Sequence, residues 1–169
     1  MATQGLTSED AVIRYLQPKL RIIVETILEK ITKENEELIN EIVYGAGTPS
    51  TPDGYIRTWD FRNKAWSSDI TKSSLYETEG EFKYDPDKMD NTHPAHAASR
   101  KYGTDVGFDM TSYLAEIIYN GVAGHIFGTG FWTEKRDAWT ALVKVVGSNT
   151  MRNWIKEGAN KAQLKISWD

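Results

Sequence analysis

The sequence of 169 residues contains no cysteine. Disulfides, thiolate nucleophiles and cysteine-ligated zinc or iron–sulfur sites are therefore excluded. It also lacks an apolar run near the ~20 residues that span a bilayer. Its first ten residues are polar, without the basic start and apolar core of a secretion signal. We therefore expect a soluble chain, assembled in the bacterial cytoplasm.

The charge balance lacks a basic excess. Twenty Lys and Arg stand against 24 Asp and Glu, both signs are mixed along the chain, and the net charge is −4. A protein that neutralises nucleic-acid phosphates needs a basic patch, so sequence-specific DNA or RNA binding is not expected. The length predicts one domain, residues 1–169, with a polar tail at 1–7 and loops or excursions at 45–54 and 72–104.

Tryptophan is abundant, with six residues. This residue type is enriched both in cores and in the hot spots of protein–protein interfaces. We expect most of the six to be core residues and one or two to lie at an interface. They are Trp59, Trp66, Trp132, Trp139, Trp154 and Trp168.

Residues 8–43 carry apolar side chains at intervals of three and four, which predicts a long helix with one buried stripe. Pro18 lies inside this pattern. A proline removes one helical hydrogen bond and clashes with the preceding turn, so we expect a break or kink near Tyr15–Gln17. The longer piece would then be 18–43.

The rest of the chain mixes strand and helix patterns. A last amphipathic helix is predicted to begin at Ser148 or Thr150 and to include Ala162. Residues 139–146 favour extended structure by β-propensity, with a helix start as the alternative. The fold class is therefore α+β, with a long N-terminal helix, an antiparallel β-sheet, a C-terminal helix and a final strand. The extended segments are 55–70 (or a turn plus strand), 81–84, 113–122 and 164–168.

Motifs for catalysis or cofactor binding are weak. His93 and His96, with Asp90 nearby, could present two imidazoles to a metal, but no third ligand is indicated. The acids of residues 85–90 lack the central glycine and closing glutamate of a calcium loop. Polar surface segments explain both. We expect no enzyme, no cofactor and no metal.

Two glycine-rich segments could cradle a phosphate, Gly45–Gly47 and Gly124–Gly130. Neither ends in Gly-Lys-Ser/Thr, and neither carries the full dinucleotide fingerprint. Close backbone packing is the other use of such glycines. A small nucleotide-binding protein or enzyme that uses the loop 121–130 remains the alternative function, and a toxin or effector-like adaptor is a second one.

Two segments match a known pattern. They are residues 54–66, with Arg57-Thr58 and Phe61, and residues 119–139, with Phe127-Gly128-Thr129-Gly130. In this order, after a long N-terminal helix, they resemble the minor-capsid, neck or tail-completion proteins of tailed bacteriophages. The resemblance covers roughly residues 20–165. Trp59 departs from it, because the family often has glycine there, and this departure concerns the turn after Thr58.

The resemblance implies a structural virion protein that forms a homo-oligomeric ring, often sixfold, at the head–tail junction. Its partners would be copies of itself, the phage connector or adaptor, and the tail tube or tail terminator. Genomic DNA would pass through the lumen without sequence-specific binding, and no membrane is involved. The competing interpretation places Trp59 and Trp66 in the core and Arg57 in a local ion pair. The interface candidates are Arg57, Thr58, Trp59, Phe61, Trp66, Phe127, Gly128, Thr129, Gly130 and Trp132.

Overall fold

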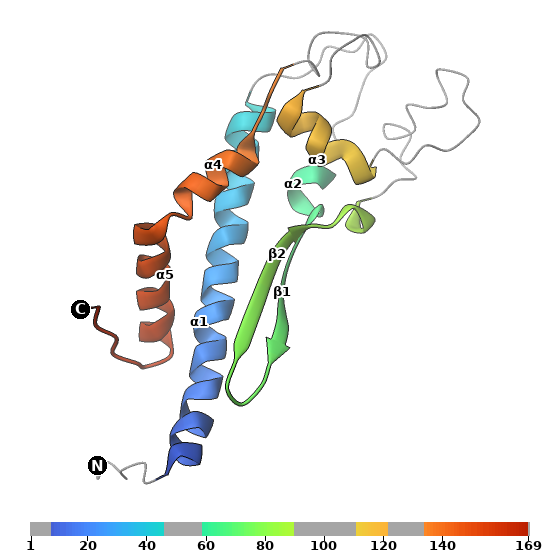
Figure 1. The fold of residues 1–169 in the computed structure, drawn as a ribbon. Coiled ribbons are helices and arrows are strands. Elements are labelled where there is room, and N and C mark those ends of the chain that lie inside the picture. Colours follow the sequence, from blue (N-terminus) through green and yellow to red (C-terminus); the bar gives the residue numbers. More distant parts are fainter. Residues whose placement is uncertain (1–7, 46–58, 90–110, 122–133, 169) are drawn as a thin grey trace. The chain divides into compact units, whose positions relative to one another are not determined.

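The computed structural model describes residues 8–45, 59–89, 111–121 and 134–168. Helix α1 is followed by a π-helical turn, then by a two-stranded antiparallel sheet and by three further helices (Figure 1). The α+β class is therefore confirmed. The elements are α1 (Glu9–Leu38), the π turn (Ile39–Tyr44), α2 (Asp60–Asn63), β1 (Trp66–Ser73), β2 (Thr78–Tyr84), a 3-10 turn (Pro86–Lys88), α3 (Thr111–Asn120), α4 (Ala138–Val145) and α5 (Ser148–Lys161).

The chain forms two compact units. The first unit comprises residues 1–32, 68–82 and 145–169, and the second comprises residues 33–67 and 83–144. Each unit has its own cluster of buried apolar side chains.

In the first unit, α5 runs antiparallel to α1 (Figure 1). Ile23 of α1 is buried with Ala159 and Ala162. The two helices approach closely at Gly158, where an added Cβ would lie 2.8 Å from the Cα of Ile23. Lys30 Nζ pairs with Glu157 Oε2 at 2.9 Å. Small residues on α5 therefore let the α1 backbone come near.

The β-hairpin of the first unit lies on the other side of α1 (Figure 1). A Cβ added to Gly80 of β2 would lie 2.7 Å from Val24 Cγ1 and 2.9 Å from Leu28 Cδ1. The hairpin closes through the amide of Ser74, which donates to the carbonyl of Glu77 at 2.8 Å. Helix α1 is thus covered on two sides, by α5 and by the hairpin.

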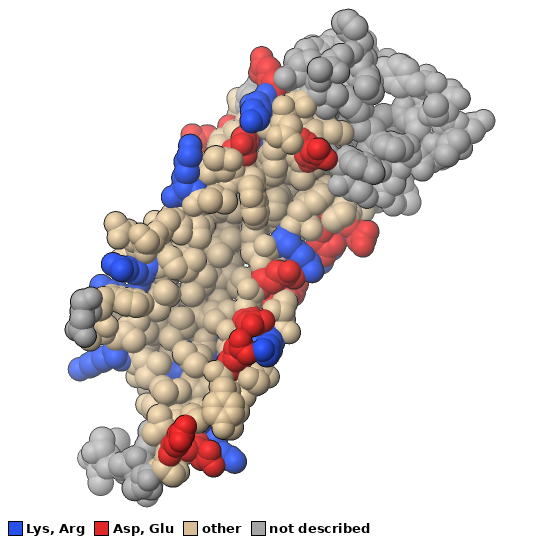
Figure 2. Space-filling view, in the orientation of Figure 1, with Lys and Arg blue, Asp and Glu red and all other residues tan. Residues whose placement is uncertain are grey.

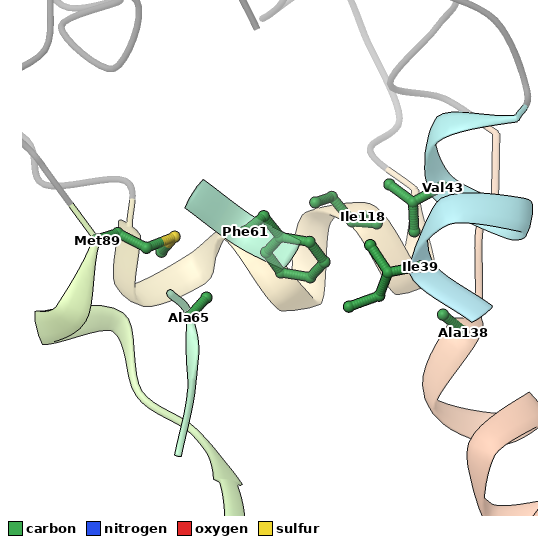
Figure 3. Packing of buried hydrophobic residues seen from close by; sticks show 7 residues of the cluster. All are labelled: Ile39, Val43, Phe61, Ala65, Met89, Ile118 and Ala138. Atoms are coloured by element: carbon green, nitrogen blue, oxygen red, sulfur yellow. The ribbon is translucent and has the colours of Figure 1, made fainter. Parts of the chain in front are cut away.

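The second unit is built around the π turn. Figure 3 shows Ile39 and Val43 of this turn close to Ile118 of α3, with Phe61 of α2 beside Ile118. Ala65, Met89 and Ala138 complete the buried cluster.

Several sequence-based predictions are confirmed. The long N-terminal helix forms, β2 includes the predicted strand 81–84, and α5 matches the predicted last helix. Of the break or kink predicted near Tyr15–Gln17, the break is wrong, because α1 continues through Pro18. A proline costs one backbone bond, and the apolar residues on both sides of Pro18 continue the same pattern.

Two predicted strands, 113–122 and 164–168, are wrong, and for 139–146 the structure shows the helix that was the alternative to extended structure. Residues 111–120 form α3 and residues 138–145 form α4. In α4, Ala138 and Leu142 lie four residues apart and are both buried on one helical face. In α3, Ile118 is buried, and Leu114, one turn earlier, packs partly buried against the same cluster. Residues 164–168 pair with no strand among the residues that the structure describes. Of the two expected loops, residues 72–104 contain β2 and the 3-10 turn before position 90, and 45–54 lies outside the described residues after Gly45.

Candidate interface

Three of the ten candidate interface residues lie in the described part of the chain, namely Trp59, Phe61 and Trp66. All three belong to the second unit. The other seven lie outside the described residues: Arg57, Thr58, Phe127, Gly128, Thr129, Gly130 and Trp132.

Phe61 is a core residue of this chain. Its exposed fraction is 4%, so it has little surface to offer a partner. Its ring meets Trp66 edge-on, with centroids 5.9 Å apart, and lies 6.1 Å from the ring of Tyr119. Phe61 therefore belongs to the buried cluster of the second unit and, in this chain alone, leaves almost no side-chain surface for an interface.

Trp66 is half-buried at the start of β1 and is held on two sides. Its indole Nε1 donates a hydrogen bond to the carbonyl oxygen of Phe61 at 2.9 Å. Its ring contacts Tyr84 at 5.5 Å between centroids, and stacks on Trp139 at 5.9 Å with only 10° between the planes. Trp66 thus links the core to a ring at the surface.

Trp139, on α4, is 39% exposed. One turn further on, Val143 is 58% exposed, so the two apolar side chains share one outward face of the helix. Trp139 was not among the candidates of the sequence analysis. The sequence signal for an outward apolar face is the four-residue spacing of Trp139 and Val143. This spacing indicates a shared face only if residues 138–145 are helical.

The N-terminus of α4 is capped by Asp137. Its Oδ1 accepts a hydrogen bond from the amide of Thr140 at 2.9 Å, and its Oδ2 accepts one from the Thr140 hydroxyl at 2.8 Å. The hydrogen bond from the Thr140 backbone amide is the main cause that holds the pKa of the Asp137 carboxyl below its usual value. This cap, of the kind that stabilises helix starts, positions Trp139 two residues later.

Trp59 has an unusual backbone. Its φ is 62° and its ψ is 9°, in the left-handed region that favours glycine. Its carbonyl accepts hydrogen bonds from the amides of Arg62 at 3.1 Å and Asn63 at 2.9 Å, so it begins the α2 turn.

The Trp59 ring, 37% exposed, lies between two side chains. Tyr44 meets it edge-on with centroids 4.6 Å apart, and the Arg62 guanidinium carbon lies 4.9 Å from its centroid. Arg62 is itself fixed, because its Nη1 donates to Asn40 Oδ1 at 2.6 Å. Trp59 and Trp139 are thus two exposed indoles, each resting on ordered neighbours.

The other candidate sites show little chemistry. In the part of the chain that the structure describes, no three His, Cys, Asp or Glu side chains gather as metal ligands. Asp85 accepts a hydrogen bond from Ser67 Oγ at 3.3 Å and lies 3.6 Å from Lys88 Nζ. His93, His96 and the loop 124–130 lie outside the described residues.

Among the described residues, no helix is both long enough and apolar enough to cross a membrane. Comparisons with protein-family models, with curated proteins and with solved structures found no significant match to this chain.

Proposed function

We propose that this chain is a structural subunit of the head–tail junction of a tailed bacteriophage, where copies of it form a ring between the head connector and the tail. It acts by docking and carries out no catalysis. The proposal starts from the two motifs in residues 54–66 and 119–139 and from their order along the chain.

The observation that carries the proposal is the backbone of Trp59. This residue occupies the position where the resembled family often has glycine. A tryptophan there would speak against the resemblance if the turn had ordinary backbone angles, but its φ of 62° is one that glycine adopts without cost. Although residue 59 is tryptophan and not glycine, its backbone therefore has the conformation of a glycine turn.

The exposed indoles support a docking role. Tryptophan is the residue type most often found in interface hot spots. Stacking on Trp66 holds Trp139 in place, so little side-chain entropy remains to be lost when a partner covers it. Val143 extends the same apolar face. In a closed ring this patch would meet a different patch of the neighbouring copy, because ring interfaces are heterologous.

The charge distribution fits a lumen through which DNA moves. Figure 2 shows Lys and Arg interspersed with Asp and Glu on the visible face. The net charge of −4 leaves no basic excess to hold phosphates. DNA could therefore pass without being retained.

The proposal is tested by particle assembly. A tagged copy of the chain is expressed with the head and tail genes that neighbour its own gene, and particles are imaged in negative stain with the tag labelled. We expect label at the neck. A gene remote from capsid and tail genes, or a folded chain that never enters particles, would contradict the proposal.

A matched pair of variants tests the Trp139–Val143 patch. Val143→Gln removes exposed apolar surface without touching the buried cluster, and Lys144→Gln is the control on the neighbouring exposed position. We expect Val143→Gln to reduce the labelled fraction of particles while Lys144→Gln leaves it unchanged. Equal incorporation of the two variants would remove this patch from the interface.

A further inference from the structure

The C-terminal segment, Leu164–Trp168, has a strand pattern but no strand partner among the described residues. Leu164 is anchored, because its amide donates to the Ala159 carbonyl at 2.8 Å and its side chain packs on the cluster between α1 and α5. Ile166 and Trp168, at alternate positions, are exposed. Trp168 contacts Arg152 of α5, whose guanidinium carbon lies 5.8 Å from the ring centroid.

The β-hairpin of the same unit offers an edge. In the described residues the sheet has only two strands, so β1 carries no further neighbour on its outer side. Along β1, Ile70 is half-buried while Asp69 and Thr71 are exposed. Two-stranded sheets are marginal alone, and an open edge is a template for another strand.

We infer that residues 164–168 of one copy add as a parallel strand to the β1 edge of the next copy. Placing Ile166 beside Ile70 brings Lys165 beside Asp69 and Ser167 beside Thr71. The same register sets Trp168 against the aliphatic stem of Lys72, whose ammonium pairs with Glu77 of its own hairpin. Apolar, charged and hydroxyl side chains are all matched, and cross-strand pairs of these kinds stabilise sheets.

The two segments also carry net charges of opposite sign, with Glu77 and Glu79 of the hairpin paired to Lys72. Residues 68–82 of the hairpin carry four acids and one lysine, whereas residues 148–168 of α5 and the tail carry four basic residues and one acid. The two surfaces lie on opposite sides of α1, so the tail is kept from its own hairpin (Figure 1).

Because donor and acceptor surfaces lie on opposite sides, the contact is heterologous. Each copy donates its tail to one neighbour and accepts the tail of another, which builds a ring or a filament. The inference rests on the self-assembly in the proposed function but needs neither a phage particle nor the Trp139 patch. It assigns a role to a segment that the two resembling motifs do not include.

Because the chain has no native cysteine, a disulfide can form only between cysteines that are introduced. Purified Asp69→Cys protein is mixed with Lys165→Cys protein under mild oxidation, and disulfide-linked dimers are measured on a non-reducing gel. Oxidation joins the two thiols and passes two electrons to the added oxidant. Because the disulfide-linked dimer does not dissociate, it accumulates even when the contact is weak. The control mixture pairs Asp69→Cys with Lys156→Cys, an exposed position on α5.

We expect the Asp69→Cys and Lys165→Cys mixture to give more product than the control and than either variant alone. A yield no higher than the control would overturn the inference. Particle incorporation is measured separately. A cross-link without incorporation would contradict the phage assignment but would still support the strand contact.

A charge exchange gives a second readout. Asp69→Lys or Lys165→Asp alone should weaken self-association, measured by analytical ultracentrifugation, by up to about fivefold. The double variant, Asp69→Lys with Lys165→Asp, should restore it, and added salt should weaken the native contact. Failure of the double variant to recover would contradict the Lys165–Asp69 register.

Discussion

Replacing Trp59 separately by alanine and by glycine isolates the cost of its backbone. Both substitutions remove the ring, and with it the contacts to Tyr44 and Arg62. An aromatic pair contributes about 0.5–1.5 kcal/mol beyond its buried area, and an exposed cation–π contact about 0.5–1 kcal/mol. We therefore expect Trp59→Ala to lower the free energy of unfolding by about 2 kcal/mol.

Glycine should recover part of that loss. A side chain at φ 62° costs roughly 1–2 kcal/mol relative to an ordinary conformation, and alanine keeps that cost while glycine does not. Glycine also loses more backbone entropy on folding, which offsets part of the gain. The expected result is that Trp59→Gly is more stable than Trp59→Ala by about 1 kcal/mol, or about 2–4 °C in Tm.

The assay is urea and thermal unfolding followed by circular dichroism. Glu36, exposed on α1, provides the matched control, because glycine there should be less stable than alanine by about 1 kcal/mol. The sign of the Gly–Ala difference must therefore invert between the two sites. If alanine is the more stable residue at position 59 as well, the left-handed conformation of Trp59 is refuted, and the support that it gives to the proposed function is lost.

Two further predictions concern the two units separately. Gly158→Val places a side chain against the backbone of Ile23 and should lower the free energy of unfolding by about 1–3 kcal/mol, more than Asn160→Val on the exposed side of α5; equal losses would contradict the close helix contact. Burial raises the pKa of Tyr119 well above its usual value, so the folded state keeps the phenol neutral and loses stability as the pH rises above about 10, where the unfolded chain ionises. Tyr119→Phe should raise the pH midpoint of alkaline unfolding, while Tyr76→Phe at the exposed hairpin tip should not, and an unchanged midpoint for Tyr119→Phe would refute this.

The long helix was predictable because its apolar stripe extends over many turns. A sustained period of three and four residues outweighs a local breaker such as Pro18. The short segments were not predictable in the same way. Residues 113–122 and 139–146 are dense in apolar side chains, and a buried helix and a buried strand of that length have similar patterns. Tertiary contacts of Ile118 and Leu142 decide for helix.

The interface itself stays a prediction, and the structure shows only where three of its candidate residues lie. Phe61 and Trp66 pack against each other, and Trp66 lies between core and surface, whereas Trp59 packs on Tyr44 instead. The outward position of Trp139 depends on the helical state of α4, and the burial of Phe61 depends on partners from α3 and the π turn. Contacts between segments distant in sequence leave no periodic trace, so the division between core and surface emerges only from the fold.

The π turn at the end of α1 has a consequence for chain length. Its hydrogen bonds reach five residues back, as in the bond from the amide of Gly45 to the carbonyl of Asn40 at 2.8 Å. An ordinary helical turn spans one residue fewer. The π turn therefore holds one residue more than an ordinary helical turn. A chain with one residue fewer in this turn would keep Tyr44 on the same side of the helix, where it contacts Trp59.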